Sequence, residues 1–220
     1  MLANGYIVVG ASGIIGRQIS ARLNELKKDV VKISGRRFAD LEEKRLSYAV
    51  KEILEELQAR SMSLSRVGII FAHRQRGGGV IDILRNEHRL CGQLIALIVE
   101  KVQRLDAIIL GSITGSRFDS RSSEAYHYAK DFQKTCVRQS IRFPNLNMNL
   151  LELSWFEKYP PEMADSDYQS RMQEVVELLG ANNVPNVTDI TDFALQILEA
   201  KLPPRGQVIS YDGGYSTLQR

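Results

Sequence analysis

Short apolar segments alternate with longer segments of helical periodicity along almost the whole chain, and this alternation restricts the fold more than any other feature. The apolar segments are rich in Val and Ile, which is typical of strands buried on both faces of a parallel sheet. They are predicted at residues 6–9, 30–33, 67–71, 107–110, 149–153 and 207–211. Parallel strands need crossover connections, and helices supply them. The sequence therefore predicts an α/β fold: a Rossmann-type, doubly wound parallel sheet with helices on both faces.

The segments between the strands carry the spacing of amphipathic helices, at residues 14–26, 41–59, 81–102, 124–142 and 190–200. The second of these helices follows the second strand so closely that a third strand near residue 40 would be short at best. At 220 residues the chain fits one domain, 1–220, better than two small ones.

Charge and cysteine content exclude several classes of function. The formal net charge is +3 and the 29 basic residues are spread along the chain, so no nucleic-acid footprint is evident. No apolar run approaches the roughly 20 residues of a membrane helix, and no signal peptide precedes the first strand. Cys91 and Cys136 lack partner His or Cys residues at metal spacing, so we interpret both as reduced core thiols. We expect a cytoplasmic protein that binds no metal, nucleic acid or membrane.

A glycine-rich turn joins the first strand to the first helix. Glycines at 10, 13 and 16 would allow a tight turn, a close approach of the backbone to a pyrophosphate, and close packing of helix on strand. The N–H groups at the start of the helix would then face the phosphate charge. We predict that this turn binds a dinucleotide through Gly10, Ser12, Gly13, Ile15 and Gly16.

The turn after the second strand bears on the choice of cofactor. An acidic residue there would bond the adenosine ribose, whereas a basic one would pair with a 2′-phosphate. Arg36 and Arg37 occupy this turn, and Arg17 beside the glycine turn could assist. A solvated basic turn is the alternative interpretation. We expect NADP to be preferred over NAD.

Tyr126 and Lys130 are four residues apart on a predicted helix, so their side chains would share one face. An ammonium beside a phenol stabilises the phenolate and lowers a phenol pKa that is ordinarily about 10. The phenol could then act as an acid or a base near neutral pH. Ser112 follows a strand at the carboxyl edge, where open α/β sheets bind ligands, and its hydroxyl could hold a substrate oxygen.

The glycine turn, Ser112-Ile-Thr-Gly115, Tyr126 with Lys130, and the terminal Gly206–Gly214 segment occur in the order found in short-chain dehydrogenases. The chain resembles that family over nearly its whole length. The resemblance implies a catalytic Ser112, a proton-transferring Tyr126, and a Lys130 that also holds the nicotinamide ribose. Asp40 and Leu41 resemble the family's acidic-aliphatic pair at the adenine ring. Hydride would pass reversibly between the nicotinamide and a small carbonyl or alcohol substrate.

Three segments depart from the family pattern. Ala72 is a predicted cofactor contact, but its loop lacks the family's asparagines and carries Arg74 and Arg76, which either clamp an anion or are solvated. His73 is either catalytic or orienting, or a plain loop residue. The asparagine of the family's proton relay would fall near Arg89, with Asn86 three positions away.

The third departure lies in residues 154–185, which we interpret as a variable substrate lid. Ser154-Trp155-Phe156 replaces the Pro-Gly that the family usually carries after the sixth strand. Trp155, Phe156 and Tyr159 either line the pocket or pack the lid. The histidines at 88 and 127 are interpreted as surface or packing residues. Substrate identity is therefore not readable beyond a small carbonyl or alcohol, anionic or sugar-like.

Two other functions stay open. The missing asparagines favour a degenerate sensor or scaffold that binds the dinucleotide without turnover. The spacing of the glycines favours an epimerase or dehydratase with retained NAD, although the chain lacks the large C-terminal substrate region of such enzymes. The resemblance also implies a homodimer or homotetramer, with the helix that carries Tyr126 and Lys130 at the interface.

Overall fold

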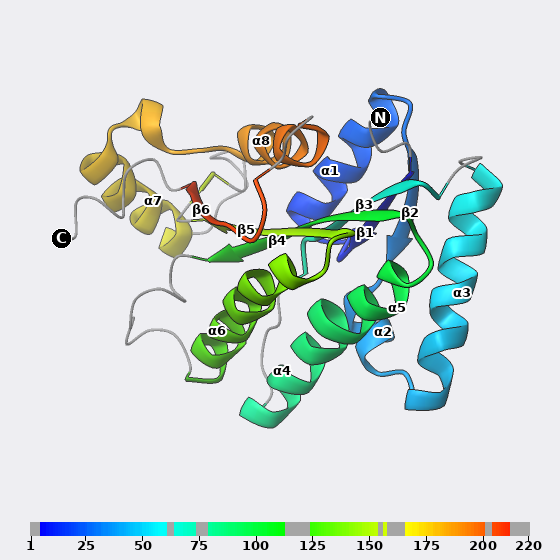
Figure 1. Ribbon diagram of the computed structural model, residues 1–220. Helices are drawn as coiled ribbons and strands as arrows, with labels where there is room; N and C mark the ends of the chain where they lie inside the picture. The colour runs from blue at the N-terminus through cyan, green and yellow to red at the C-terminus, as the bar shows by residue number, and fades with distance from the viewer. Residues whose placement is uncertain are drawn as a thin grey trace.

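Six strands form one sheet in the order β2-β1-β3-β4-β5-β6, and each neighbouring pair is parallel (Figure 1). The computed structural model describes residues 5–60, 64–73, 79–112, 124–153, 156–157, 166–200 and 204–211. The strands are β1 (Gly5–Val9), β2 (Asp29–Ile33), β3 (Arg66–Phe71), β4 (Arg104–Ser112), β5 (Leu146–Leu153) and β6 (Val208–Tyr211). The predicted doubly wound parallel sheet is confirmed.

Helices cover both faces of the sheet. One face carries α1 (Ile14–Glu25) and α8 (Val187–Glu199). The other carries α2 (Gly35–Ala39), α3 (Glu43–Arg60), α4 (Val80–Glu87), the π-helical η1 (His88–Leu94), α5 (Ile95–Val99) and α6 (Glu124–Gln139). The remaining helices are η3 (Ser140–Arg142), α7 (Ser166–Leu179) and η5 (Ala181–Asn183). None of the helices in the described part of the chain is long and apolar enough to span a membrane.

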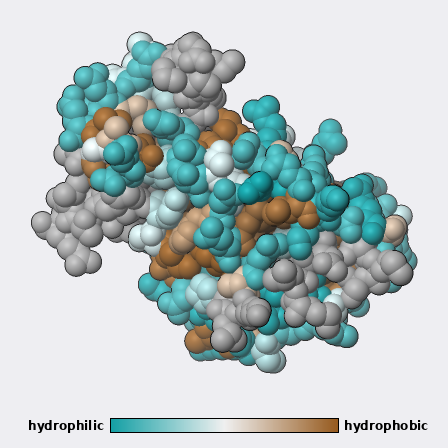
Figure 2. Space-filling view, turned by 90° about the horizontal axis from the view of Figure 1, so that it is seen from above, coloured by the Kyte–Doolittle hydropathy of each residue, from teal (hydrophilic) through white to brown (hydrophobic). Residues whose placement is uncertain are grey.

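The central strands are buried because both of their faces pack against helices. In β1, Ile7 and Val9 pack with α3 and η1, whereas Tyr6 and Val8 pack with α1 and α8. Successive side chains of a strand point to opposite faces, so an uninterrupted apolar segment serves both layers. Figure 2 views the face of α1 and α8 and shows a band of hydrophobic residues among hydrophilic ones.

The connection from β2 to β3 differs from the sequence expectation. The segment predicted as a turn forms the short helix α2, whose N-cap Ser34 accepts a hydrogen bond from the Arg37 N–H at 3.4 Å. The chain then passes directly into α3, and the described residues between β2 and β3 contain no further strand. Likewise, the helix predicted over 81–102 is divided by the π-helical segment, where the backbone carries an extra residue per turn.

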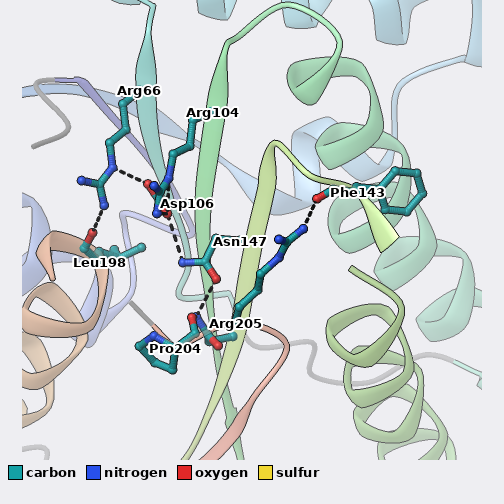
Figure 3. A network of polar contacts seen from close by, with 9 residues as sticks. Arg66, Arg104, Asp106, Phe143, Asn147, Leu198, Pro204 and Arg205 are labelled. Atoms are coloured by element: carbon teal, nitrogen blue, oxygen red, sulfur yellow. Dashed lines mark hydrogen bonds and ion pairs between the residues drawn. The ribbon is translucent and has the colours of Figure 1, made fainter. Parts of the chain in front are cut away.

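A buried polar network joins β3, β4 and β5 at the amino-terminal edge of the sheet (Figure 3). The Arg66 guanidinium lies 2.5 Å from the Asp106 carboxylate and also donates to the Leu198 carbonyl. Asn147 donates to the same carboxylate at 3.1 Å, and Arg104 pairs with it from the solvent side. Four elements are thus fastened together at the edge opposite the glycine turn.

Candidate active site at the carboxyl edge of the sheet

The order of the strands places a ligand site between β1 and β3. The chain leaves β1 for β2 on one side and returns to β3 on the other, so these two neighbours form the topological switch point of the sheet. Ligands of open α/β sheets bind outside the carboxyl ends of strands at such a point. Gly10 follows β1 and His73 follows β3, and a Cβ on Gly10 would lie 2.7 Å from the His73 backbone nitrogen. The two loops therefore meet at the predicted cofactor position.

The glycine turn requires glycine at two positions. Gly10 has φ +83, a left-handed conformation that other residues adopt at a cost. A Cβ on Gly16 would lie 2.3 Å from the Gly10 carbonyl oxygen, so any side chain there would push α1 away from the turn. The backbone thus comes close to the helix start, as a pyrophosphate cradle needs.

The first turn of α1 presents its N–H groups at the same place. Gly13 is the N-cap and has no side-chain oxygen to bond them, and Ser12 is exposed beside it. Ile15 and Ala72 are half-buried and pack against the core beneath the turn. These residues fit the phosphates of a dinucleotide, because a helix N-terminus favours negative charge.

The two arginines after β2 have different surroundings. The Arg36 side chain is 93% exposed and lies 3.9 Å from Asp40. Arg37 lines a hollow of about 320 Å³ between β2, α2 and α3. Leu41 packs against the core, and its carbonyl accepts a hydrogen bond from Arg89. An exposed guanidinium such as that of Arg36 can pair with a phosphate.

Ser112 and Tyr126 are described in their backbone only, and their side chains lie outside the described part of the structure. Ser112 is the last residue of β4 and pairs with Leu153 of β5. Tyr126 lies in the first turn of α6, a helix that packs against both of these strands. Lys130 follows one turn later and is 5% exposed. The fold thus brings the three predicted residues to the same edge as the glycine turn.

Lys130 belongs to a chain of hydrogen bonds that runs through the helix layer. Its Nζ donates to the Gln133 Oε1 at 3.1 Å, and the Gln133 Nε2 donates to the Glu87 Oε2 at 2.8 Å. The Glu87 Oε1 lies 3.1 Å from the His73 Nε2. We call these four residues the carboxyl-edge network. It links the end of β3, the last residue of α4 and the buried side of α6.

Glu87 is ionised within this network. Burial alone would raise the pKa of its carboxyl, but His73, Lys130 and the Gln133 hydrogen bond together lower that pKa to about 2. Burial raises the pKa of the Cys136 thiol to about 11, and burial together with the Glu87 charge raises that of Cys91. Both cysteines are free thiols, as the sequence predicted. Thiols with raised pKa values are weak nucleophiles near neutral pH.

His73, Glu87 and Cys91 also have ligand atoms within 4.8 Å of one another, a spacing that could hold a metal ion. Each group is already engaged, however. One Glu87 oxygen faces His73, and the other accepts from both Gln133 and the Cys91 thiol at 3.5 Å. The nearby Lys130 ammonium would repel a cation. These contacts favour a network of ion pairs and hydrogen bonds over a metal centre.

The other candidate residues have separate positions. The Arg89 Nη1 donates to the Ala39 carbonyl at 2.7 Å, so it ties η1 to the α2–α3 connection. Asn86 is half-buried, His88 is exposed and packs near Phe132, and Phe156 packs against the core. Arg74, Arg76, Trp155 and Tyr159 lie outside the described residues.

Sequence reasoning missed Glu87 and Gln133. The sequence did carry a signal for both residues, because each lies at a helical spacing from buried apolar residues of its own helix. Glu87 lies four residues from Ile83 and from Cys91, and Gln133 lies four residues from Ala129 and from Val137, all of which are buried. A carboxylate or amide in an apolar stripe indicates a partner across the interface.

No protein-family model and no curated protein matches the chain. Solved structures do. The 3-alpha-hydroxysteroid dehydrogenase of Pseudomonas sp. B-0831, in complex with NADH, is similar over 98% of both chains, with a TM-score of 0.71 and 16% identity. A short-chain dehydrogenase/reductase of the glucose/ribitol dehydrogenase type from Brucella melitensis is similar over 97% of both chains, with a TM-score of 0.68 and 14% identity. The chain has the fold of these dehydrogenases.

Proposed function

We propose that the chain is a short-chain dehydrogenase/reductase that transfers hydride between NADP(H) and a small carbonyl or alcohol. The observation that carries the proposal is the buried Lys130 ammonium, held on α6 one turn beyond Tyr126, beside the strand that ends at Ser112. The glycine turn at the switch point of the same sheet edge supports dinucleotide binding.

In this proposal, the nicotinamide supplies or accepts the hydride when the cofactor is bound. Ser112 holds the substrate oxygen. In reduction, Tyr126 donates a proton to that oxygen as hydride reaches the carbonyl carbon, and in oxidation the phenolate accepts the alcohol proton. The positive charge of Lys130 stabilises the phenolate and holds the nicotinamide ribose.

The preference for NADP over NAD rests on the turn after β2. Arg36 is highly exposed there, and the only acidic group that an ion pair brings to it among the described residues is Asp40 at 3.9 Å. An arginine at this position suits a 2′-phosphate. Asp40 and Leu41 stay the proposed contacts of the adenine ring.

A dinucleotide-binding sensor or scaffold is the second candidate. The loop that begins at Ala72 lacks the asparagines that the family has there. Arg89, near the expected position of the relay asparagine, bonds the backbone of the α2–α3 connection. The usual asparagine contacts and the usual proton relay would then both be missing. This candidate predicts cofactor binding without turnover, whereas the leading proposal predicts both.

The proposed function is tested by fluorescence titration with NADPH and NADH, followed by turnover on a panel of carbonyls and alcohols. Tyr126→Phe should bind cofactor normally but lose about 10²- to 10⁴-fold in kcat, because it lacks the transferable proton. Tyr128→Phe is the matched control, since Tyr128 is exposed on the same helix, and it should keep full activity.

Each negative result has its own meaning. If the wild type binds neither dinucleotide at micromolar concentration, both candidates are wrong. If it binds but turns over none of the panel, the sensor is favoured. If Tyr126→Phe is as active as the wild type, Tyr126 is not the acid.

We also propose a homodimer or homotetramer with α6 at the interface. The helices α4 and α6 pack together. Among the described side chains, α4 exposes the large hydrophobic Ile81 and α6 exposes Tyr128. Sedimentation velocity measures the oligomeric state directly, and a monomer would contradict the proposal.

A further inference from the structure

Glu87 is a charged residue in a place where charge is costly. Its side chain is 2% exposed, at the junction of α4 with the π-helical η1. An ionised carboxylate loses several kcal/mol of hydration in such a place unless it is well paired. Its lowered pKa agrees with pairing. A hydrophobic residue at this position would often be as stable, so the charge calls for a role beyond stability.

The groups around Glu87 come from three elements. His73 follows β3, and Cys91 lies on η1 one turn along. The helix α6 contributes Gln133 by a hydrogen bond, Lys130 by its charge, and the neutral thiol of Cys136 nearby. The charge of the proposed catalytic Lys130 acts on Glu87 directly. The side-chain amide of Gln133 also links the two groups by a path of hydrogen bonds.

The contact of the Gln133 amide with Glu87 determines which atom of that amide faces Lys130. The amide Nε2 donates to Glu87, so its Oε1 is turned toward the Lys130 Nζ. If the amide were reversed, its NH₂ group would face the ammonium and its oxygen would face the carboxylate, and both contacts would be repulsive. Because the Gln133 side chain is fully buried, water cannot replace either partner. The Glu87 carboxylate therefore fixes the acceptor that holds Lys130.

We infer that Glu87 is a positioning residue that holds the Lys130 ammonium through Gln133. This inference rests on the proposed function, in which Lys130 holds the nicotinamide ribose. Glu87 then acts on the nicotinamide half of the cofactor and leaves the adenine half unaffected. That difference between the two halves is measurable without knowledge of the substrate.

The test compares the whole cofactor with its adenine half. Affinities for NADPH and for 2′,5′-ADP are measured by calorimetry on the wild type and on Glu87→Gln, or with NADH and ADP if the wild type prefers NADH. Glu87→Gln should weaken NADPH binding about tenfold and change 2′,5′-ADP binding by less than about twofold. A merely structural role would weaken both ligands alike.

Two further variants serve as controls for the comparison of the two affinities. Gln133→Leu cuts the same path without removing a charge, so it should reproduce the selective loss even if Glu87→Gln folds poorly. Asp106→Asn removes a buried carboxylate from the opposite edge of the sheet. It should lower stability and leave the ratio of the two affinities as in the wild type.

Equal weakening of both ligands, or no change in either, in the two path variants would overturn the inference. Failure of the proposed function is seen separately, in the wild type alone. If the wild type binds no dinucleotide, the proposed function fails before any variant is compared, and the inference falls with it.

Discussion

The two edges of the sheet each carry a buried polar network, and the two networks are built from different chemical groups. At the amino-terminal edge, Asp106 binds Arg66 and Asn147 (Figure 3). At the carboxyl edge, Glu87 binds His73 and Gln133. Each network thus centres on one buried carboxylate that joins three elements or more.

The difference lies in the partners of the carboxylate. The partners of Asp106 are guanidinium groups, which do not lose their proton in proteins, and an amide, which does not titrate. Imidazole and ammonium groups can exchange protons, and His73 and Lys130 bring these groups to the network around Glu87. Partners with permanent charges suit a network that holds strands and helices together. Partners that can carry protons suit a network next to a site of proton transfer. Under the proposed function, the amino-edge network serves stability alone, and the carboxyl-edge network serves the proposed chemistry as well as stability.

The largest expected effect is the destabilisation caused by Asp106→Asn. The change leaves the Arg66 guanidinium, whose side chain is 8% exposed, without its carboxylate. Breaking a buried pair in this way costs about 3–5 kcal/mol of unfolding free energy. Urea unfolding followed by circular dichroism measures it, with NADPH affinity determined below the transition. Lost affinity at unchanged stability would contradict the division between the two edges.

A somewhat smaller loss of unfolding free energy is expected when the pH is lowered. Because the pKa of Glu87 is lowered from 4.5 to about 2 in the folded state, its ionised form adds stability above pH 4.5. This stability is lost as the pH falls toward 2, and its full size is on the order of 3 kcal/mol. The wild type should therefore lose stability between pH 5 and pH 3 more steeply than Glu87→Gln, as measured by urea unfolding.

The control for acid is Asp82→Asn, since Asp82 is an exposed carboxylate on the same helix, paired with Arg85 at 2.8 Å. An exposed pair contributes only about 0–1 kcal/mol, so this variant should follow the wild type at every pH. Parallel curves for the wild type and Glu87→Gln down to pH 3 would mean that Glu87 is not held as a paired anion.

Features that depend on local sequence were predicted well. The strands and most helices were found because their periodicity is written in neighbouring residues. The glycine turn was found because φ +83 at Gly10 and the 2.3 Å approach at Gly16 are demands that only glycine meets. The residues after β2 were predicted as a turn, but they form α2, whose N-cap Ser34 accepts a hydrogen bond from the Arg37 N–H.

The carboxyl-edge network could not be predicted from local sequence. Glu87 meets His73 across 14 residues and Gln133 across 46 residues, so its burial depends on how α4 packs against α6 and β3. Family spacing pointed instead to the neighbourhood of Arg89, whose side chain bonds the α2–α3 connection. Here tertiary packing decides which polar residue faces the site.

The smallest expected effect concerns Arg36, an exposed charge at the carboxyl edge. Arg36→Ala should weaken NADPH binding about tenfold and leave NADH binding unchanged, because only the 2′-phosphate needs the guanidinium. Lys51→Ala is the matched control, since Lys51 is an exposed cation in an i,i+4 pair with Glu55 on α3, and it should change neither affinity. Both variants should unfold like the wild type. Equal weakening of NADPH and NADH would remove the NADP preference and would leave the glycine turn as the source of cofactor affinity.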